Sequence, residues 1–273
     1  MRVLISNDDG IHAPGILALQ KYLSKVADVY VVAPLEEKST TGHSLTLHKP
    51  LRLHSFGNRR WAVTGSPADC VYLGIREVMK KKPDLVVSGI NRGANMGQDV
   101  YYSGTVSAAR EASILGIPSL AVSLDVDFFR SAPDVPAHYD SAGRMAVKVI
   151  QKLSKEGKRL GIPPHTLLNL NVPDLPFREL KGIRLARQGF RFYTGNVLRR
   201  KDHRGKDYFW VGGSYEGYHE DEGTDCDWVG RGFASLTPLK LDSTDFNWLT
   251  EFEDSWAPRK APARRGKGAR APR

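Results

Sequence analysis

Short apolar runs alternate with stretches of helical spacing along the first two thirds of the chain. The runs have four to seven residues and predict buried strands over 2–6, 29–33, 61–64, 84–88, 118–124 and 166–172. Apolar residues three or four positions apart predict helices over 14–26, 67–80, 105–115 and 138–156. Buried strands that are separated by helices are typical of a parallel sheet covered on both faces. We therefore predict an α/β fold with a doubly wound, mostly parallel sheet.

The pattern changes after about residue 183. Aromatic residues and glycines alternate through 189–218, around a charged turn at Lys201–Gly205. This alternation predicts antiparallel hairpins. We expect a C-terminal hairpin arm over approximately 183–232, suited to oligomerisation or to covering a binding site.

The charge of the chain is concentrated at its C-terminal end. Lys and Arg number 40 against 30 Asp and Glu, which gives a formal net charge of +10. Residues 257–273 carry seven basic residues and no acid, so 33 basic and 30 acidic residues remain in 1–256. The last segment has no hydrophobic periodicity, and we predict a disordered basic tail after a single folded domain over 1–256. Nucleic-acid binding is thus suggested only weakly, by the tail.

Other broad classes of protein are disfavoured. No stretch approaches the roughly 20 apolar residues that span a bilayer, so we expect no membrane partner. The N-terminal residues lack the features of a secretory signal. Cys70 and Cys226 are too few for a disulfide framework, and neither belongs to a CxxC pair. We expect reduced thiols in a cytoplasmic protein, with a disulfide between the two as the alternative.

Polar residues follow the predicted strands where the chain leaves the sheet. Asp8 and Asp9 come after the first strand, and Ser39 lies in the loop after the second. Asn91 and Asn95 come after the fourth. Ligands bind outside the carboxyl ends of strands in such sheets, and two adjacent carboxylates are costly to hold together without a cation. These oxygen donors suit Mg²⁺, Mn²⁺ or Ca²⁺, although Asn-Asp-Asp-Gly is also an ordinary turn sequence.

Ser103-Gly104-Thr105 precedes a predicted helix and suggests a phosphate site. Glycine lets the backbone approach an anion, and the first turn of a helix offers free N–H groups and a positive dipole end. An ordinary Ser or Thr N-cap is the alternative. Motifs for a P-loop, a dinucleotide cofactor and an α/β-hydrolase elbow are missing. Among the histidines only His43, near Ser39, stays a candidate for the site.

Together these loops resemble those of the SurE family of survival proteins, which are metal-dependent nucleotide phosphatases. The matching segments follow one another in order: S-N-D-D-G-I-H-A-P-G (6–15), the Ser39 loop with H-S-L-T-L (43–47), G-S-P-A-D-C-V (65–71), S-G-I-N-R-G-A-N-M-G (88–97) and Y-S-G-T-V-S-A-A-R-E (102–111). They cover roughly the first 125 residues, and S-L-T-P-L (235–239) is similar to the closing strand of the family. The resemblance departs at one point, because Thr40 stands where family members commonly have Gly.

The resemblance implies a SurE-like fold and a set of site residues. One divalent ion per subunit, Mg²⁺ or Mn²⁺, is expected on Asp8, Asp9, Ser39 and Asn91. The substrate phosphate is expected on Asn95, Ser103, Gly104 and Thr105. The family also forms dimers or tetramers through a C-terminal arm, which implies a homodimer or homotetramer here.

The expected reaction is hydrolysis of phosphate monoesters, in particular nucleoside 5′-monophosphates, with 3′-monophosphates and short polyphosphate as further substrates. Asp8 or Asp9 is the expected acceptor of the proton from the attacking water, and the sequence does not choose between them. A covalent aspartyl-phosphate mechanism is a rival, although it needs a second acid two positions after the nucleophile, whereas these two acids are adjacent. The rival from another class is a nucleotide- or nucleic-acid-binding protein with weak or no catalysis.

Overall fold

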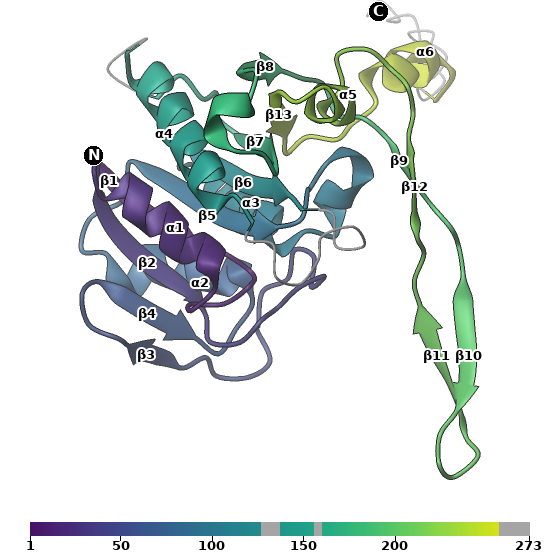
Figure 1. Cartoon of the computed structure of the whole chain (residues 1–273), viewed down its shortest axis with the longest axis horizontal. Coiled ribbons are helices and arrows are strands. Elements are labelled where there is room, and N and C mark those ends of the chain that lie inside the picture. Colours follow the sequence, from purple (N-terminus) through teal and green to yellow (C-terminus); the bar gives the residue numbers. More distant parts are fainter. Residues whose placement is uncertain (127–136, 156–159, 257–273) are drawn as a thin grey trace, which may run out of the picture. The chain divides into compact units, whose positions relative to one another are not determined.

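The protein is described by a computed structural model over residues 1–126, 137–155 and 160–256 (Figure 1). Its main sheet, within these residues, has nine strands. In spatial order they are β3 (Leu53–Ser55), β4 (Arg60–Val63), β2 (Asp28–Pro34), β1 (Arg2–Ser6), β5 (Leu85–Arg92), β6 (Ser119–Asp125), β7 (Thr166–Pro173), β13 (Ala234–Lys240) and β8 (Ile183–Leu185). The pairs β3–β4 and β7–β13 are antiparallel and the other neighbours are parallel, which confirms the predicted mostly parallel sheet.

Helices cover both faces of this sheet. Helices α1 (Pro14–Leu23) and α4 (Tyr139–Lys155) lie side by side on one face, and their apolar side chains share one core with Val3 and Ile5 of β1 (Figure 1). Helices α2 (Pro67–Leu73) and α3 (Gly104–Ile114) pack on the other face, which receives Leu4. Successive side chains of a strand point to opposite faces, so one apolar run supplies both cores. The predicted doubly wound arrangement is confirmed.

The order of the strands reverses at β1. The chain runs from β1 through α1 to β2, and later returns through α2 to β5 on the other side of β1. The last residue of β1, Ser6, is in register with Ser88 of β5. A crevice forms outside the carboxyl ends of two strands at such a switch point, and it is the usual ligand site of open α/β sheets.

Several elements differ from the sequence prediction. Helix α1 ends at Leu23, because Ser24 caps it and the apolar side chain of Val26 is exposed. The helix predicted over 67–80 is divided into α2 and a π-helical turn, η1 (Gly74–Val78). Strand β3 and helix α5 (Asp225–Gly230) were not predicted, since they are short and lack an apolar run. The short helices η2 (Gly97–Tyr101) and η3 (Phe177–Glu179) were missed as well.

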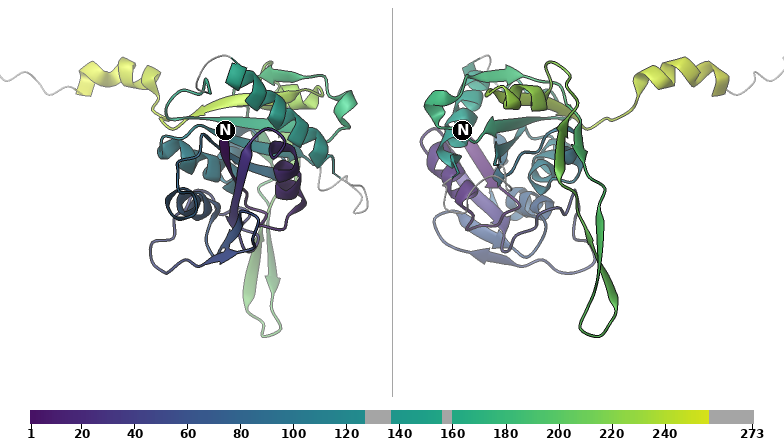
Figure 2. Two further views of the ribbon diagram at one scale, coloured as in Figure 1. Left: turned by 90° about the vertical axis from the view of Figure 1, so that its left-hand side faces the viewer. Right: turned by 45° about the vertical axis from the view of Figure 1, so that its right-hand side comes forward.

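The predicted hairpins are present as one long antiparallel ribbon. Strand β9 (Arg191–Tyr193) pairs with β12 (Tyr215–Tyr218), and β10 (Val197–Lys201) pairs with β11 (Asp207–Val211). Figures 1 and 2 show the ribbon projecting beyond the nine-stranded sheet. It is shorter than the range predicted for the arm, because β8 belongs to the sheet and α5 packs on β13.

The C-terminal end of the chain forms a second compact unit, which begins at Asp242. Its described part contains helix α6 (Phe246–Trp256). The predicted tail over 257–273 lies outside the described residues. None of the helices in the described ranges is both long enough and apolar enough to cross a membrane.

Candidate metal and phosphate site

A cavity of about 580 Å³ lies at the carboxyl ends of β1 and β5. Six of the eight predicted site residues line it: Asp8, Asp9, Ser39, Asn91, Asn95 and Ser103. Asn91 belongs to the end of β5, which continues to Arg92 and is longer than the strand predicted over 84–88, and the other five come from the segments between the strands and helices. The other two, Gly104 and Thr105, lie directly behind Asp8. The structure therefore gathers all eight predicted residues at one place.

The turn after β1 fixes both carboxylates. The Asn7 side chain donates to the Gly10 carbonyl at 2.9 Å, and Gly10 takes a φ of +100°. The carbonyl of Asp8 accepts a hydrogen bond from the Lys38 amide at 2.8 Å, which ties this turn to the Ser39 loop. An ordinary turn accounts for the Asn and the Gly, but it does not account for a buried Asp8 beside Asp9.

Burial disfavours the charge of both carboxylates, and the charge of Asp8 further disfavours that of Asp9. Burial raises the pKa of Asp8 above its ordinary value of 3.8, and the hydrogen bond from Thr105 opposes this increase. Burial and the adjacent charge of Asp8 raise the pKa of Asp9 to about 7. The charge of Glu37 raises both pKa values. The charge of Arg92 lowers the pKa of Asp9, but this offsets only a part of the increase. Such a pair is stabilised by a cation.

Thr105 connects two of the predicted metal ligands. Its hydroxyl donates to Asp8 Oδ1 and lies 3.2 Å from Asn91 Oδ1. The side-chain amide nitrogen of Asn91 donates to the Gly93 carbonyl at 2.9 Å, so the Oδ1 atom is the one that faces Thr105. The sequence predicted phosphate binding for Thr105; that role stays a prediction, and its hydroxyl is directed here at Asp8.

Gly104 allows α3 to approach Asp8 closely. A Cβ atom at this position would lie 2.7 Å from Asp8 Cβ and 2.8 Å from Asp8 Oδ2. Ser103 caps the helix, because its Oγ accepts a hydrogen bond from the Val106 amide at 3.0 Å. The N-cap alternative thus describes Ser103 correctly, and the same residue still lines the cavity.

The loop after β2 places Ser39 at the rim of the cavity. The Ser39 hydroxyl is exposed and donates to Glu37 Oε1 at 2.6 Å. Thr40 takes a φ of +58°, the left-handed conformation that glycine adopts most easily. Thr40 stands where the family commonly has Gly, and its backbone has the conformation that glycine would favour at this position.

Side chains hold this loop from behind. His43 Nε2 lies 2.9 Å from Oε2 of Glu111, a buried residue of α3. Asp69 accepts hydrogen bonds from the Thr46 amide at 2.8 Å and from the Thr46 hydroxyl at 2.6 Å, and it forms a capping box with Ser66 at the start of α2. The segment 65–71 thus supports the loop that carries Ser39, and the candidate His43 is a part of the same support.

Asn95 lies in the loop between β5 and η2 and is 7% exposed. Its side chain donates to Ser123 Oγ on β6 at 2.7 Å. Two asparagines of β7, Asn169 and Asn171, hydrogen-bond to its backbone. None of these three partners was identified from the sequence, because β6 and β7 reach this loop only through the tertiary fold.

Five further charged or phenolic residues line the cavity and were not among the predicted site residues: Glu37, Arg92, Asp99, Tyr102 and Tyr139. Glu37 and Arg92 are neighbours of predicted ligands in sequence, and their charge was a usable signal. Tyr139 comes from α4, which no local pattern connects to this edge of the sheet. Burial and the charge of Asp9 raise the pKa of Tyr139 to about 12.

The donor set fits a hard divalent cation. Within 1–126, 137–155 and 160–256, there is no group of three or more His, Cys, Asp or Glu side chains that could hold a metal ion by themselves. A cation at this cavity would therefore bind the carboxylates of Asp8 and Asp9 together with hydroxyl and amide oxygens from Ser39 and Asn91. Oxygen donors of this kind suit Mg²⁺ or Mn²⁺ and do not suit a thiolate-rich zinc site.

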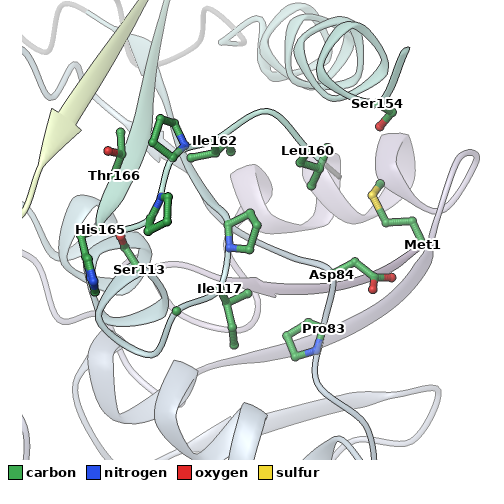
Figure 3. A pocket seen from close by; sticks show the side chains of 14 residues that line it. Met1, Pro83, Asp84, Ser113, Ile117, Ser154, Leu160, Ile162, His165 and Thr166 are labelled. Carbon is green, nitrogen blue, oxygen red and sulfur yellow. The ribbon is translucent and has the colours of Figure 1, made fainter. Parts of the chain in front are cut away.

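A second cavity, of about 850 Å³, lies near the amino ends of β1 and β5 (Figure 3). Its walls are formed largely by prolines and aliphatic side chains around Met1, Ile117 and Ile162. The carboxylate of Asp84 in this cavity already accepts a hydrogen bond from the Arg2 amide at 2.7 Å. No pair of carboxylates lies among its lining residues, so the smaller cavity is the better candidate for chemistry.

Comparison with known proteins agrees with this geometry. The family model described as "Survival protein SurE" matches residues 3–195. A protein of Geotalea uraniireducens named 5′-nucleotidase SurE is 46% identical over 249 residues, which are 91% of this chain and 96% of that protein. The protein of the same name from Syntrophotalea carbinolica is 48% identical over 246 residues, 90% of this chain and 94% of its own.

A solved structure has the same fold. The crystal structure of the SurE protein from Aquifex aeolicus superposes with a TM-score of 0.80 at 41% sequence identity. The match covers 93% of this chain and 99% of the Aquifex chain. With a family model over most of its length and relatives of this similarity, the chain belongs to the SurE family.

Proposed function

We propose that this chain is a 5′-nucleotidase, a phosphoric monoester hydrolase that converts nucleoside 5′-monophosphates to nucleoside and inorganic phosphate with a divalent metal ion. The observation that carries the proposal is the clustering of Asp8, Asp9 and Asn91 in one cavity beside the start of α3. Its curated relatives are named 5′-nucleotidases, which agrees with this chemistry.

The metal would be held by Asp8, Asp9, Ser39 and Asn91, one ion in each subunit, with Mg²⁺ or Mn²⁺ as the ion. A bound divalent cation supplies Lewis acidity, which lowers the pKa of water and offsets the charge of the phosphoryl group. The Ser39 hydroxyl donates its hydrogen to Glu37, which leaves the oxygen lone pairs free for a cation. The Gly93 carbonyl accepts a hydrogen bond from the Asn91 amide nitrogen, which leaves the Asn91 oxygen facing the Thr105 hydroxyl that also contacts Asp8.

The phosphate would be bound by the residues that face the cavity around the start of α3. Asn95 and Ser103 offer an amide and a hydroxyl, and the backbone at Gly104 and Thr105 belongs to the first turn of the helix. Helix N-termini favour anions, because their N–H groups lack partners within the helix and carry the positive end of the dipole. These donors are in place before substrate binds, which reduces the reorganisation that the reaction requires.

Asp9 is the proposed acceptor of the proton from the attacking water. Asp8 is fixed by the Thr105 hydroxyl and packs against Gly104, whereas Asp9 is less buried and lines the cavity. A pKa of about 7 for Asp9 is suited to proton transfer near neutral pH.

A metal-by-substrate panel tests the proposed function. Purified protein with Mg²⁺ or Mn²⁺ should release phosphate from nucleoside 5′-monophosphates, and excess chelator should stop the release. The panel includes 3′-monophosphates and short polyphosphate, which we propose as further substrates of the same cavity. Activity that persists in excess chelator, or no activity with any divalent ion, would contradict the proposal.

The hairpin ribbon supports a further part of the proposal, a homodimer or homotetramer. The outer part of the ribbon exposes large apolar side chains on both strands, Val197 and Leu198 on β10 and Phe209, Trp210 and Val211 on β11. Exposed apolar surface of this extent favours contact with another chain. Light scattering should give a dimeric or tetrameric mass, and a lower mass is expected after Trp210→Ser and Val211→Ser.

We further propose a cytoplasmic location. Cys70 and Cys226 are both buried with free thiols, which is typical of a reducing compartment. Burial raises the pKa of both thiols and keeps them protonated. Thiol labelling of the denatured protein, isolated under conditions that block exchange, should find both cysteines reduced.

A further inference from the structure

The peptide groups of Asn95 are held by two asparagines from a distant strand. The Asn95 amide donates to Asn171 Oδ1 at 2.8 Å, and its carbonyl accepts from Asn171 Nδ2 at 3.1 Å. The same carbonyl accepts a second hydrogen bond, from Asn169 Nδ2 at 2.7 Å. Three hydrogen bonds thus converge on the backbone of one loop residue from side chains more than 70 positions away in sequence.

Asn169 and Asn171 lie two positions apart on β7, so they share one face of the sheet. The alternate residues Leu168, Leu170 and Val172 pack in the apolar core of the opposite face. In the parallel pair β6–β7, Asn171 is in register with Ser123, the residue that accepts the hydrogen bond from the Asn95 side chain. Both the backbone and the side chain of Asn95 are therefore fixed by the same end of the sheet.

Burial of two side-chain amides in a strand costs free energy of folding wherever a polar atom is left without a hydrogen bond. Both side chains are 0% exposed, and in the described part of the chain Asn169 Oδ1 has no hydrogen-bond partner. A buried acceptor without a partner costs free energy that an apolar residue would avoid. Filling of the sheet interior alone therefore does not explain the polar pair.

We propose that Asn169 and Asn171 are positioning residues for phosphate binding, and that they act through Asn95. This inference rests on the proposed function, since Asn95 is there a phosphate-binding residue. An amide nitrogen carries two hydrogens, and Ser123 takes one of those on Asn95 Nδ2. The second is available to a phosphate oxygen in the cavity that Asn95 lines, provided that the loop is held in this place.

The loop around Asn95 is not part of a strand or helix, and besides the asparagines it is held by Met96, which packs on Cys226 and Val229 of α5. It lies between the end of β5 and the start of η2, and no strand or helix includes residues 93–96. The proposed metal ligands Asp8 and Asn91 are held by other contacts, those with Thr105 and Gly93. Loss of the asparagine pair is therefore expected to affect phosphate binding much more than metal binding.

Asn171→Ala and Asn169→Ala test the proposal, with Thr166→Ala as the matched control. Thr166 is also a buried polar residue of β7, but it lies at the other end of the strand and has no contact with Asn95 among the hydrogen bonds of the described residues. Calorimetry measures the binding of inorganic phosphate to the Mn²⁺-loaded protein, and Mn²⁺ binding is measured separately without phosphate. Urea unfolding verifies that each variant is folded.

Phosphate affinity should fall about tenfold or more in Asn171→Ala, because the displaced Asn95 side chain would lose its hydrogen bond to the charged phosphate. Mn²⁺ affinity should change less than about twofold, and the Thr166→Ala control should keep both affinities. An unchanged phosphate affinity in a folded variant, or an equal loss of both affinities, would overturn the proposal. Asn169→Ala removes only one hydrogen bond to Asn95, so it is the variant to measure if Asn171→Ala does not fold, and the same selective loss of phosphate affinity is expected.

A double-mutant cycle separates action through Asn95 from a general effect. In the Asn95→Ala background, Asn171→Ala should weaken phosphate binding no further, because the positioned side chain is already missing. Additive losses would contradict the proposal. If the wild-type protein binds no phosphate with Mn²⁺ present, the proposed function fails instead, and the two failures are thus distinguishable.

Discussion

The Thr105 hydroxyl donates a hydrogen bond to the Asp8 carboxylate across 97 positions of sequence. The same hydroxyl lies 3.2 Å from Asn91 Oδ1. One side chain at the start of α3 thus links the ends of β1 and β5, the two strands at which the sheet order reverses. A buried hydroxyl in this position orients both proposed ligands before any metal arrives.

Thr105→Val tests this orientation, since it keeps the shape of the side chain and removes the hydroxyl. Asp8 then loses the hydrogen bond that lowers its pKa, so its protonated form becomes more favourable. Partners that orient metal ligands typically contribute about 10- to 100-fold to metal affinity, and a loss of that size is expected. Mn²⁺ titration measures the affinity. Thr105→Ser should retain it, and equal affinities in the Val and Ser variants would contradict the assigned role.

Gly104→Ala is expected to reduce activity and metal affinity although alanine favours helices. The new Cβ would lie 2.7 Å from Asp8 Cβ, a distance that requires the carboxylate or the helix to move. Gly161→Ala is the control, because a Cβ atom there meets nothing within 4 Å. Steady-state kinetics with a nucleoside monophosphate, together with Mn²⁺ titration, compares the two. A Gly104→Ala variant as active as Gly161→Ala would show that the close approach has no functional role.

Much of this site was predictable because its residues lie at or just after the ends of strands. Asp8 and Asp9 follow the first apolar run and Asn91 follows the run over 84–88, so their position at the sheet edge could be predicted from the chain itself, although β5 continues through Asn91 to Arg92. The hydroxyl direction of Thr105 and the two amides of Asn169 and Asn171 could not be predicted. They depend on how α3 and β7 pack against loops far away in sequence, and local patterns hold no information on such contacts.

The fold was predictable to a similar depth. The parallel strands and the four main helices have strong apolar periodicity, which tertiary contacts then reinforce. Strand β3 has three exposed residues and forms only because β4 offers an open edge, so its sequence has no strand pattern. Helix α1 also ends earlier than its pattern predicts. The apolar periodicity continues to Val26, but the helix ends at Leu23 with Ser24 as its C-cap, and the amides of Val26 and Ala27 both turn back to the Leu23 carbonyl.

The metal-free protein should lose stability as the pH rises from about 4 to about 7. The pKa of Asp9 is about 7 in the folded protein and 3.8 as its ordinary value, and the pKa of Asp8 is raised as well. The folded state therefore binds more protons than the unfolded state in this window, so the contribution is present at low pH and is lost as the pH rises. Urea unfolding with chelator measures it. Saturating Mn²⁺ should weaken or reverse the trend, because metal binding releases these protons.

Asp9→Asn should stabilise the metal-free protein at neutral and higher pH while activity falls by orders of magnitude. The amide removes a charge that burial and Asp8 disfavour, and it also removes the proposed proton acceptor. Unfolding in chelator and phosphate release with Mn²⁺ measure the two effects. Ser24→Ala, at the cap of α1, is a control away from the cavity and should not stabilise the protein. An Asp9→Asn variant that is less stable than wild type at pH 8 would contradict the charge repulsion inferred for this pair.

Removal of residues 257–273 should separate the net charge of the chain from its catalysis. These residues supply seven of the ten net positive charges, and all eight predicted site residues lie within the first 105 positions of the chain. Phosphate release from nucleoside monophosphates should therefore be unchanged in the shortened chain. Retention on a polyanion column should weaken and depend less steeply on salt, because fewer basic residues release counterions.

The rival function, binding of nucleic acid with little catalysis, predicts the reverse. The full-length protein would then be inactive, and its affinity for nucleic acid would persist without the tail. The same preparation, tested in both assays, decides between them.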